Sequence, residues 1–412
     1  QPYLHLSSLS SPALAMRSCH SMVVLACAAG TAGLSVRMSA APAGATSSPT
    51  SSTTAEPLLL RAARGEVTEQ TPVWMMRQAG RHMKCYRDLV KDYPTFRERS
   101  EIPDVSFEIS MQPRDAYGTD GVILFSDILT PLPAMGVDFA ISEGGAITIE
   151  PIRTREDFAK MTAKPFEPET RCHFVGEVLS RLRTQLAGTD ATVLGFVGLP
   201  FTIGTYLIEG ATGTKTGFAA MRELRESDPQ LAKDMLGLVA ERIAQYAVYQ
   251  IDSGAQVIQV FDSWAGHLTP EEFDEWAAPY QRQVVSTIKE KRPDTPVIIY
   301  MAPDTYSKGG ALIERLASSG VNVVSIDHTI SLAKAREQLD AAGYEHVGLQ
   351  GNLDPAILCD GTPEEIVAAT EDILKQAAGR PHIMNLGHGI EATTPESNAN
   401  LFVKTVQKFR SA

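Results

Sequence analysis

Eight short apolar runs, separated by longer amphipathic segments, are the strongest constraint on how this chain folds. The runs lie at residues 73–76, 121–125, 192–198, 255–261, 297–302, 321–326, 346–350 and 382–386. Apolar character that continues without alternation is typical of strands buried on both faces, as in parallel sheets. Eight such strand–helix units predict a (β/α)8 TIM barrel. A doubly wound open sheet is the alternative, but it usually has fewer strands and a glycine-rich first turn.

Helix patterns fill the gaps between these runs, at residues 228–252, 270–291, 308–319, 331–342, 363–378 and 395–410. A hydroxyl cap followed by a first-turn proline predicts helix starts at Thr269–Pro270, Thr362–Pro363 and Thr394–Pro395. Glycines that stop a helix before the next strand are expected at Gly320, Gly343 and Gly379. Residues 137–150 alternate around a glycine pair, which predicts a β-hairpin inserted after the second strand. Because no linker interrupts residues 56–412, we expect a single domain there.

Residues 1–55 differ in composition from the rest of the chain. Glu56 is the first acid, and Arg17 precedes an uncharged run that ends at Val36. The apolar part of this run suits a signal-peptide core and is too short and too rich in Ala and Gly for a good membrane span. The Ser/Thr/Ala/Pro-rich stretch after Arg37 is typical of an organelle transit peptide. We therefore expect a two-part leader for a plastid of secondary origin, with the protein in the stroma after removal of the leader and with Met16 as the true start. A disordered tail without a targeting role is the alternative.

Charge and cysteine content limit the classes of function. The net charge of −12 argues against a nucleic-acid-binding surface, although a few local arginines can still dominate a pocket for a small anion. The five cysteines are scattered, at Cys19, Cys27, Cys85, Cys172 and Cys359. Since none forms a CxxC pair, the sequence predicts neither a disulfide framework nor a zinc knuckle.

Polar residues follow the predicted strands, where a TIM barrel places its active site. The candidate site residues are Arg77, Gln78, Ala79, Gly80, Arg81, Asp127, Tyr206, Ser263 and His388. Taken singly, the arginines could pair with helix acids, Asp127 could cap a helix, and Tyr206 and Ser263 could be packing and turn residues. His388 lies between two glycines, which let a backbone approach a ligand closely. Together they predict a polyanionic ligand, held by arginine forks, that also donates hydrogen bonds to Asp127.

At these positions the chain resembles the uroporphyrinogen decarboxylase family. The matching motifs are PVWMMRQAGR (72–81), FSDIL (125–129), GFVGLPFTIGTYLIEG (195–210), FDSWAGHL (261–268), LQGNLDP (349–355) and NLGHGI (385–390). The resemblance implies a (β/α)8 barrel, often a homodimer, that removes carboxyl groups from the four acetates of uroporphyrinogen III to give coproporphyrinogen III. It implies no metal and no organic cofactor. It also implies that residues 77–81, Asp127, Tyr206, Ser263 and His388 contact the substrate, with Asp127 and Arg77 as the catalytic residues.

The chain departs from the family pattern just after the first motif. His82, Lys84 and Cys85 stand where the family more often has Tyr, Pro and Glu, whereas Tyr86 keeps an aromatic residue. This difference concerns the fit of the loop after Arg81 and leaves the predicted chemistry unchanged.

Two other functions remain as alternatives. Related cobalamin- and zinc-dependent methyltransferases need a zinc-binding His and Cys after a middle strand and another Cys near the end. Here the fifth run is followed by Pro303–Asp304 and the last by Gly387–His388, without cysteine at either place. A non-catalytic porphyrin-binding homologue is the other alternative, and it would be expected to lack Asp127 or the arginines.

We predict that residues 1–55 are dispensable for catalysis, because an acid-free, hydroxyl-rich segment precedes a complete set of strand–helix units. A form that starts at Leu58 should retain the specific activity of the full chain in a decarboxylation assay. A large loss of activity would show that this segment belongs to the catalytic fold. Mapping the N-terminus of the precursor tests whether Met16 is the start.

Overall fold

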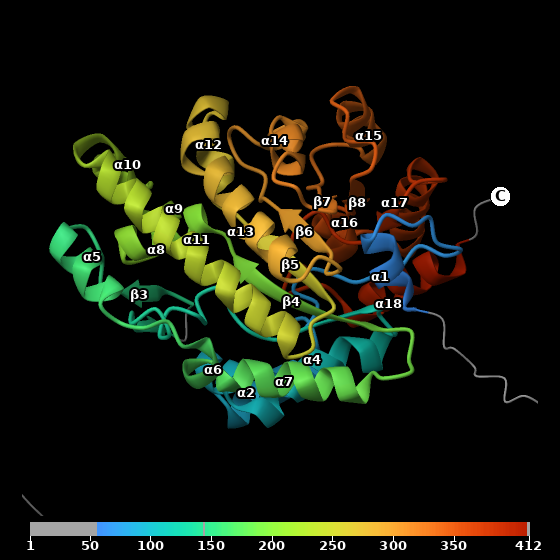
Figure 1. Ribbon diagram of the computed structural model, residues 1–412. Coiled ribbons are helices and arrows are strands. Elements are labelled where there is room, and N and C mark those ends of the chain that lie inside the picture. The colour runs from blue at the N-terminus through green and yellow to red at the C-terminus, as the bar shows by residue number, and fades with distance from the viewer. Residues whose placement is uncertain (1–55, 143–144, 410–412) are drawn as a thin grey trace, which may run out of the picture. The chain divides into compact units, whose positions relative to one another are not determined.

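The central element is a parallel sheet of seven strands, curled into part of a barrel (Figure 1). This computed structural model describes residues 56–142 and 145–409, so the expected leader lies outside the described residues. The strands, in their order across the sheet, are β1 (Gly121–Ile123), β4 (Thr192–Gly198), β5 (Val257–Phe261), β6 (Val297–Tyr300), β7 (Val323–Ser325), β8 (Gly348–Gln350) and β9 (His382–Ile383). Each falls within one of the predicted runs, and every neighbouring pair is parallel.

The first predicted run, residues 73–76, contributes a single parallel bridge between Val73 and Met384 instead of a regular strand. On one side, Trp74 N donates to Met384 O at 3.2 Å. On the other side, Asp120 N donates to Val73 O at 2.8 Å, and the carboxylate of Asp120 accepts from Val73 N at 2.7 Å. This segment therefore hydrogen-bonds to the chain next to β9 and to the chain next to β1, the two edge strands of the sheet.

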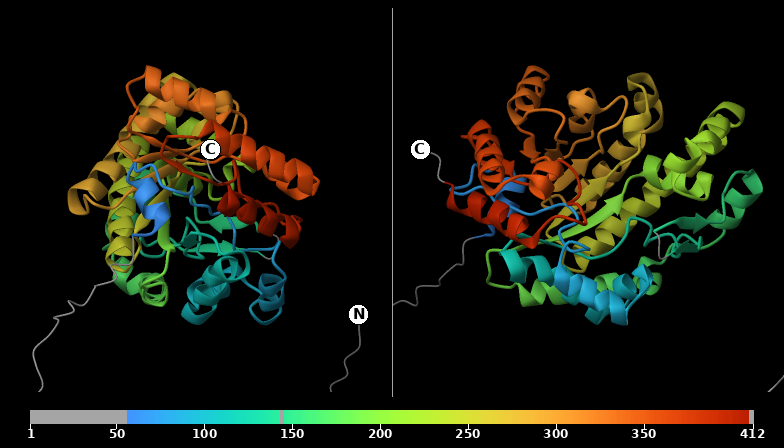
Figure 2. Two further views of the ribbon diagram at one scale, coloured as in Figure 1. Left: turned by 90° about the vertical axis from the view of Figure 1, so that its right-hand side faces the viewer. Right: turned by 180° about the vertical axis from the view of Figure 1, so that it is seen from behind.

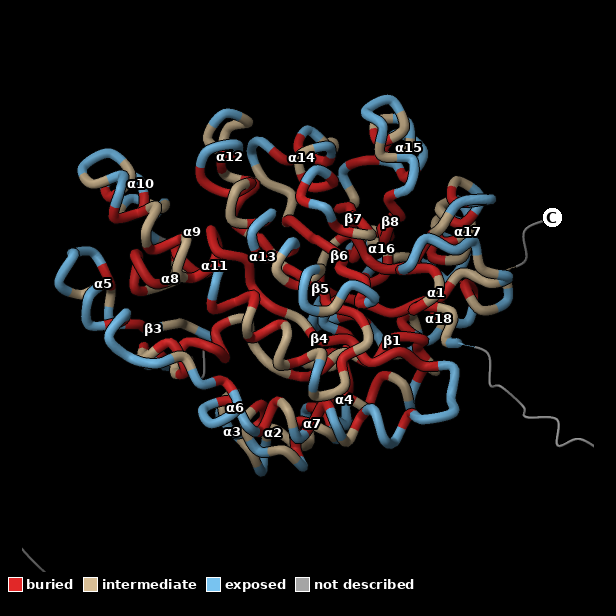
Figure 3. Tube along the Cα trace, viewed as in Figure 1, coloured by how far each residue is buried: buried red, intermediate tan, exposed pale blue. Residues whose placement is uncertain are grey.

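Helices cover the outer face of the sheet, as the two further views in Figure 2 show. Those before β4 are α1 (Leu58–Ala63), α2 (Lys84–Asp92), α3 (Phe96–Glu101), α4 (Pro103–Tyr117), α5 (Arg155–Thr162), α6 (Pro168–Arg171) and α7 (His173–Gln185). Between β4 and β6 lie α8 (Pro200–Glu209), α9 (Gly213–Thr216), α10 (Ala219–Ser227), α11 (Pro229–Asp252), the 3-10 helix η1 (Ala265–His267), α12 (Pro270–Trp276) and α13 (Ala278–Lys291). After β6 follow η2 (Lys308–Gly310), α14 (Ile313–Ala317), α15 (Leu332–Ala341), α16 (Pro355–Asp360), α17 (Pro363–Gln376) and α18 (Glu396–Lys408). Buried residues line the strands, and exposed residues occupy the outer turns of α10, α12 and α15 (Figure 3).

Local signals predicted most helix ends and failed at three places. Thr269 and Thr362 form capping boxes as expected, and Gly320, Gly343 and Gly379 stop their helices with positive φ. The expected helix 270–291 is instead two helices that meet at Ala277, because Pro279 in the first turn of α13 has no N–H to continue the hydrogen-bond ladder. The expected helix 308–319 is the short η2 followed by α14. Thr394 does not cap α18, whose N-cap is Pro395.

The helix α1 closes the end of the sheet where the strands begin. Leu59 and Ala63 of α1 form one apolar cluster with Trp74, Val257 and Ile383 at that end. Above this cluster, the interior becomes polar through a second group of buried side chains. Gln350 accepts from Trp74 Nε1 at 3.0 Å and donates to Gln259 and Ser325. A site inside the sheet must therefore open at the carboxyl-terminal ends of the strands.

Two further strands lie within the expected hairpin region 137–150. β2 (Phe139–Ile141) and β3 (Ile147–Ile149) pair antiparallel outside the main sheet, with residues 143–144 between them outside the described chain. Of the helices in the described residues, none combines the length and the apolar character that crossing a membrane requires.

A pH-dependent stability follows from the burial of Asp120. Burial raises the pKa of this carboxyl from 3.8 to about 6. Because the folded state then holds the proton more tightly than the unfolded state, the contribution of Asp120 to stability is present at low pH and is lost as the pH rises through 6. The stability of wild type relative to Asp120→Asn should therefore fall by about 2–3 kcal/mol between roughly pH 4 and pH 7. Urea unfolding across this range measures it, and a pH-independent difference would contradict the assignment.

Candidate active site

A cavity of about 920 Å³ lies at the carboxyl-terminal ends of the strands. Its wall includes every residue of the predicted site, namely Arg77, Gln78, Ala79, Gly80, Arg81, Asp127, Tyr206, Ser263 and His388. These residues come from segments that are far apart in the sequence. The parallel sheet brings the segments together because the carboxyl ends of its strands share one edge.

Arg77 and Arg81 face this cavity without a counterion. Both are exposed, and neither guanidinium forms an ion pair or a side-chain hydrogen bond with any residue that the structure describes. Pairing with helix acids, the alternative for these residues, is therefore absent from the described chain. Arg77 has a positive φ of 60°. An L-residue in this conformation stores strain, which is common at ligand-binding positions.

The side chain of Gln78, unlike those of Arg77 and Arg81, forms hydrogen bonds within the protein. Its side chain is fully buried; Oε1 accepts from Met75 N at 3.1 Å and Nε2 donates to Gly121 O at 2.8 Å. Asn385 adds a second anchor, since its Oδ1 accepts from Met76 N at 2.8 Å. The amide of Gln78 thus holds the loop that carries the two arginines, and a ligand can meet only the main chain at this position.

Asp127 lies half-buried in the cavity wall, four residues beyond the end of β1. Its Oδ1 accepts from Leu129 N at 2.8 Å, so the carboxylate does organise the following backbone. Residues 128–136 form turns instead of a helix. The alternative that Asp127 caps a helix is therefore wrong. Burial raises the pKa of Asp127, and the nearby positive charge of Arg77 acts in the opposite direction.

Tyr206 and Ser263 come from neighbouring strand–helix units. Tyr206 belongs to α8 and packs against Trp264, with ring centroids 4.0 Å apart. Burial and the charge of Asp127 both raise the pKa of the Tyr206 phenol, so it remains a neutral hydrogen-bond donor near neutral pH. Ser263, two residues beyond β5, makes no side-chain hydrogen bond within the described residues and faces the cavity.

His388 is held in place by its neighbours in the Gly387–His388–Gly389 segment. A side chain at Gly387 would meet the backbone of His328 at 2.3 Å, and one at Gly389 would meet the stem of Arg77 at 2.6 Å. The two glycines therefore accommodate close packing within the protein, whereas the sequence suggested closeness to a ligand. Burial and the charge of Arg77 lower the pKa of His388, which favours the neutral imidazole.

Several cavity residues were not among the predicted site residues. They include Phe96, Arg99, His267 and Tyr300. Tyr300 ends β6 and donates from its hydroxyl to Gly387 O at 3.1 Å, but in the sequence it is simply part of an apolar run. His267 lies in the matched FDSWAGHL motif and pairs with Asp304 at 2.8 Å. Only that motif could have indicated His267, because nothing in the sequence places Asp304 beside it.

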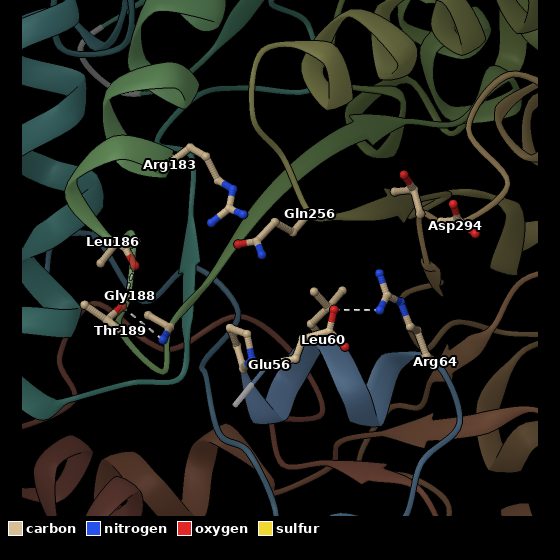
Figure 4. Close-up of a pocket in the computed structure, with 12 residues that line it drawn as sticks. Glu56, Leu60, Arg64, Arg183, Leu186, Gly188, Thr189, Gln256 and Asp294 are labelled. Carbon is tan, nitrogen blue, oxygen red and sulfur yellow. Dashed lines mark hydrogen bonds and ion pairs between the residues drawn. The ribbon is translucent and has the colours of Figure 1, made fainter. Parts of the chain in front are cut away.

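A second cavity, of about 350 Å³, lies at the opposite end of the sheet (Figure 4). Gln256, which lines it, immediately precedes β5, and Leu60 comes from α1. Its Arg64 is already paired with Glu56 at 2.6 Å. Arg183 and Asp294 also line this cavity, but none of the predicted site residues does.

A metal site of the methyltransferase type finds no support in the side chains. Among the described residues, no group of three or more His, Cys, Asp and Glu side chains is arranged to hold a metal ion. Cys172 and Cys359 are free and buried, and neither belongs to a group of this kind. The fold alone is shared with a methyltransferase from Methanosarcina mazei, which has a TM-score of 0.68 at 18% identity and covers 85% of this chain and 98% of that one.

Sequence comparisons identify the family. The family model described as "Uroporphyrinogen decarboxylase (URO-D)" matches residues 54–409. A protein named uroporphyrinogen decarboxylase from Prochlorococcus marinus (strain NATL2A) is 52% identical over 347 residues, covering 84% of this chain and 94% of its own. One with the same name from Synechococcus sp. (strain CC9605) is 52% identical over 349 residues, covering 84% and 95%. Because the family model matches most of the chain, and relatives are identical at about half of the aligned residues, this chain belongs to the uroporphyrinogen decarboxylase family.

Proposed function

We propose that this chain converts uroporphyrinogen III to coproporphyrinogen III by decarboxylating the four acetate side chains of the macrocycle. One observation carries the proposal: the guanidinium groups of Arg77 and Arg81, which have no counterion among the described residues, share a cavity with the half-buried carboxylate of Asp127. Membership of the family, and the activity for which its relatives are named, support the same conclusion.

The cavity fits the chemistry of this substrate. Uroporphyrinogen carries acetate and propionate carboxylates around its rim and pyrrole N–H groups at its centre. The guanidinium groups of Arg77 and Arg81 can each pair with a carboxylate through two parallel hydrogen bonds. The carboxylate of Asp127 can accept from the central N–H groups. The volume of about 920 Å³ lies within the range of small-molecule sites.

The substrate itself supplies the electron sink that decarboxylation requires. Protonation of the pyrrole carbon next to the acetate makes a cationic ring. The C–C bond to the carboxylate then breaks, its electron pair neutralises the ring, and CO2 leaves. Transfer of a proton to the exocyclic carbon and loss of one from the ring complete a methyl group, with one proton consumed for each acetate.

Asp127 and Arg77 have separate roles in these reaction steps. A fixed carboxylate beside the pyrrole N–H groups stabilises the ring cation as it develops, which is electrostatic stabilisation of the transition state. Arg77 holds the reacting carboxylate, and its charge helps to keep Asp127 ionised against the effect of burial. Tyr206, Ser263 and His388 bind the remaining polar groups of the substrate.

The direct test is anaerobic incubation of the purified protein with uroporphyrinogen III, followed by separation of the products. We expect stepwise loss of four carboxyl groups and accumulation of coproporphyrinogen III without added cofactor. Binding of the macrocycle without any loss of CO2 would instead support the non-catalytic porphyrin-binding alternative.

We also infer finer features of the fold, assembly and location. The hydrogen bonds of residues 72–74 to both edges of the sheet support an eighth strand and a closed (β/α)8 barrel in one domain, residues 56–412. The antiparallel pairing of β2 with β3 supports a hairpin insertion. The resemblance to the family supports a homodimer, which sedimentation measurements test. The composition of residues 1–55 and the cyanobacterial relatives support a plastid location.

Replacing either arginine by lysine should weaken turnover, because an ammonium group cannot reproduce the two-pronged contact. For both Arg77→Lys and Arg81→Lys, we expect losses of roughly 1.5–3 kcal/mol in transition-state binding, or about ten- to a hundredfold in kcat/KM. Arg292→Lys is the matched control, since that guanidinium pairs with Asp252 on the surface. Normal kinetics in both cavity variants would contradict the carboxylate-binding role.

Asp127→Asn should fold normally and lose about two to three powers of ten in kcat. The amide keeps the shape and can still accept from Leu129 N, but it cannot stabilise a cation as a carboxylate does. If Asp127 served only to organise the turn, this variant would change stability by about 1 kcal/mol or less and leave turnover close to normal. Thermal melting together with single-turnover decarboxylation separates the two roles.

A further inference from the structure

A second aspartate, Asp262, lies beside the cavity but does not line it. It follows β5 directly and is fully buried. One carboxylate oxygen accepts from Thr202 N at 3.0 Å and from Thr202 Oγ1 at 2.7 Å. The other accepts from Nε2 of Gln281, on α13, at 2.8 Å. Three hydrogen bonds thus converge on a carboxylate that the substrate cannot reach.

This carboxylate caps α8 from a different part of the chain. α8 begins at Pro200, and its own N-cap residue, Leu199, provides no side-chain hydrogen bond. The N–H groups in the first turn of a helix have no partner inside the helix, and they favour a negative charge. Thr202 N is one of these groups. By accepting its hydrogen bond, Asp262 replaces the capping residue that usually lies next to the helix in the sequence.

The same contact connects the two segments that carry Tyr206 and Ser263. Thr202 Oγ1 also accepts from Trp264 N at 3.2 Å, which ties α8 to the residue next to Ser263. Tyr206 is four residues after Thr202, so both project from the same side of the helix. The ring of Tyr206 then packs on Trp264.

We propose that Asp262 is a positioning residue that sets Tyr206 and Ser263 at the correct separation for the substrate. It acts through Thr202 and the main chain of Trp264, and it does not contact the substrate. The proposal rests on the function proposed above, because the separation matters only if both residues bind the substrate.

The structure provides a conservative variant that separates geometry from charge. Gln281 Oε1 is buried and has no partner among the described residues. In Asp262→Asn, the amide oxygen can still accept from Thr202, and its NH2 group can donate to Gln281 once that side chain turns its amide over. Asp262→Ala removes every one of these contacts. If geometry is what matters, Asp262→Asn should rescue much of the activity that Asp262→Ala loses.

Asp120 offers a matched control at the other end of the sheet. It too is a buried aspartate whose carboxylate accepts from a backbone N–H, that of Val73. Asp120→Ala therefore removes a comparable buried carboxylate without touching the cavity. Comparing the two alanine variants separates a general loss of stability from a local change in the site.

The experiment measures kcat and KM for uroporphyrinogen at a temperature where denaturation curves show each variant folded. We expect Asp262→Ala to lose about tenfold or more in kcat/KM, chiefly through KM, because Asp127 and Arg77 stay in place. Asp262→Asn should stay within about threefold of wild type, and Asp120→Ala should match wild type. Equal losses in both alanine variants, or an asparagine variant as weak as the alanine one, would overturn the proposal.

Two further measurements keep the test decisive. If Asp262→Ala does not fold, Thr202→Val and Thr202→Ser replace it, since only serine keeps the hydroxyl that joins Asp262 to Trp264; equal kinetics for these two would refute the proposal. Near-ultraviolet circular dichroism of the Tyr206–Trp264 pair, identified with a Trp264→Phe variant, should change in Asp262→Ala and not in Asp120→Ala. This signal does not depend on turnover, so an inactive wild type would refute the proposed function alone, whereas an unchanged signal would refute the positioning role.

Discussion

Burial of the sheet on both of its faces is the constraint on which the rest of this structure depends. Helices cover the outer face, and α1 with its apolar cluster closes the end where the strands begin. A charged group inside such a sheet would be costly unless it were paired or neutralised. The carboxyl-terminal edge is therefore where the fold can hold charged groups in contact with both protein and solvent, and the large cavity lies there.

Unpaired charges at this edge need a rigid backbone to hold them. The loop with Arg77 and Arg81 has no acid to fix its guanidinium groups, so the main chain is anchored instead. The buried side-chain amides of Gln78 and Asn385 form hydrogen bonds with the backbone of Met75, Met76 and the start of β1. These amides leave both arginines available to a ligand. Such preorganisation lowers the cost of ordering the site when the substrate binds.

The sequence predicted the elements better than it predicted the contacts between them. Seven of the eight apolar runs are strands, because continuous burial leaves a direct mark in the sequence. The sequence predicts one helix over residues 270–291 and does not predict the break at Ala277, where Pro279 lies in the first turn of a second helix. The roles of Gln78 and Tyr300 were also missed. Each depends on a partner far away in the chain, Gly121 and Gly387 respectively, and no local pattern records such a contact.

The difference between Asp127 and Asp262 lies in the path that the chain takes after the strand that precedes each of them. Both aspartates come soon after a buried strand, so their positions in the sequence do not show which of them lies in the active site. Side chains two residues apart point to the same side of a strand. Phe261 faces the cavity, so Ser263 faces it too, whereas Val260 packs toward the helices and Asp262 follows it there. Beyond β1 the side chains do not alternate in this way, since residues 123–128 all line the cavity and Asp127 is one of them. The path of the chain after each strand therefore places one carboxylate in the cavity wall and the other at the N-terminus of α8.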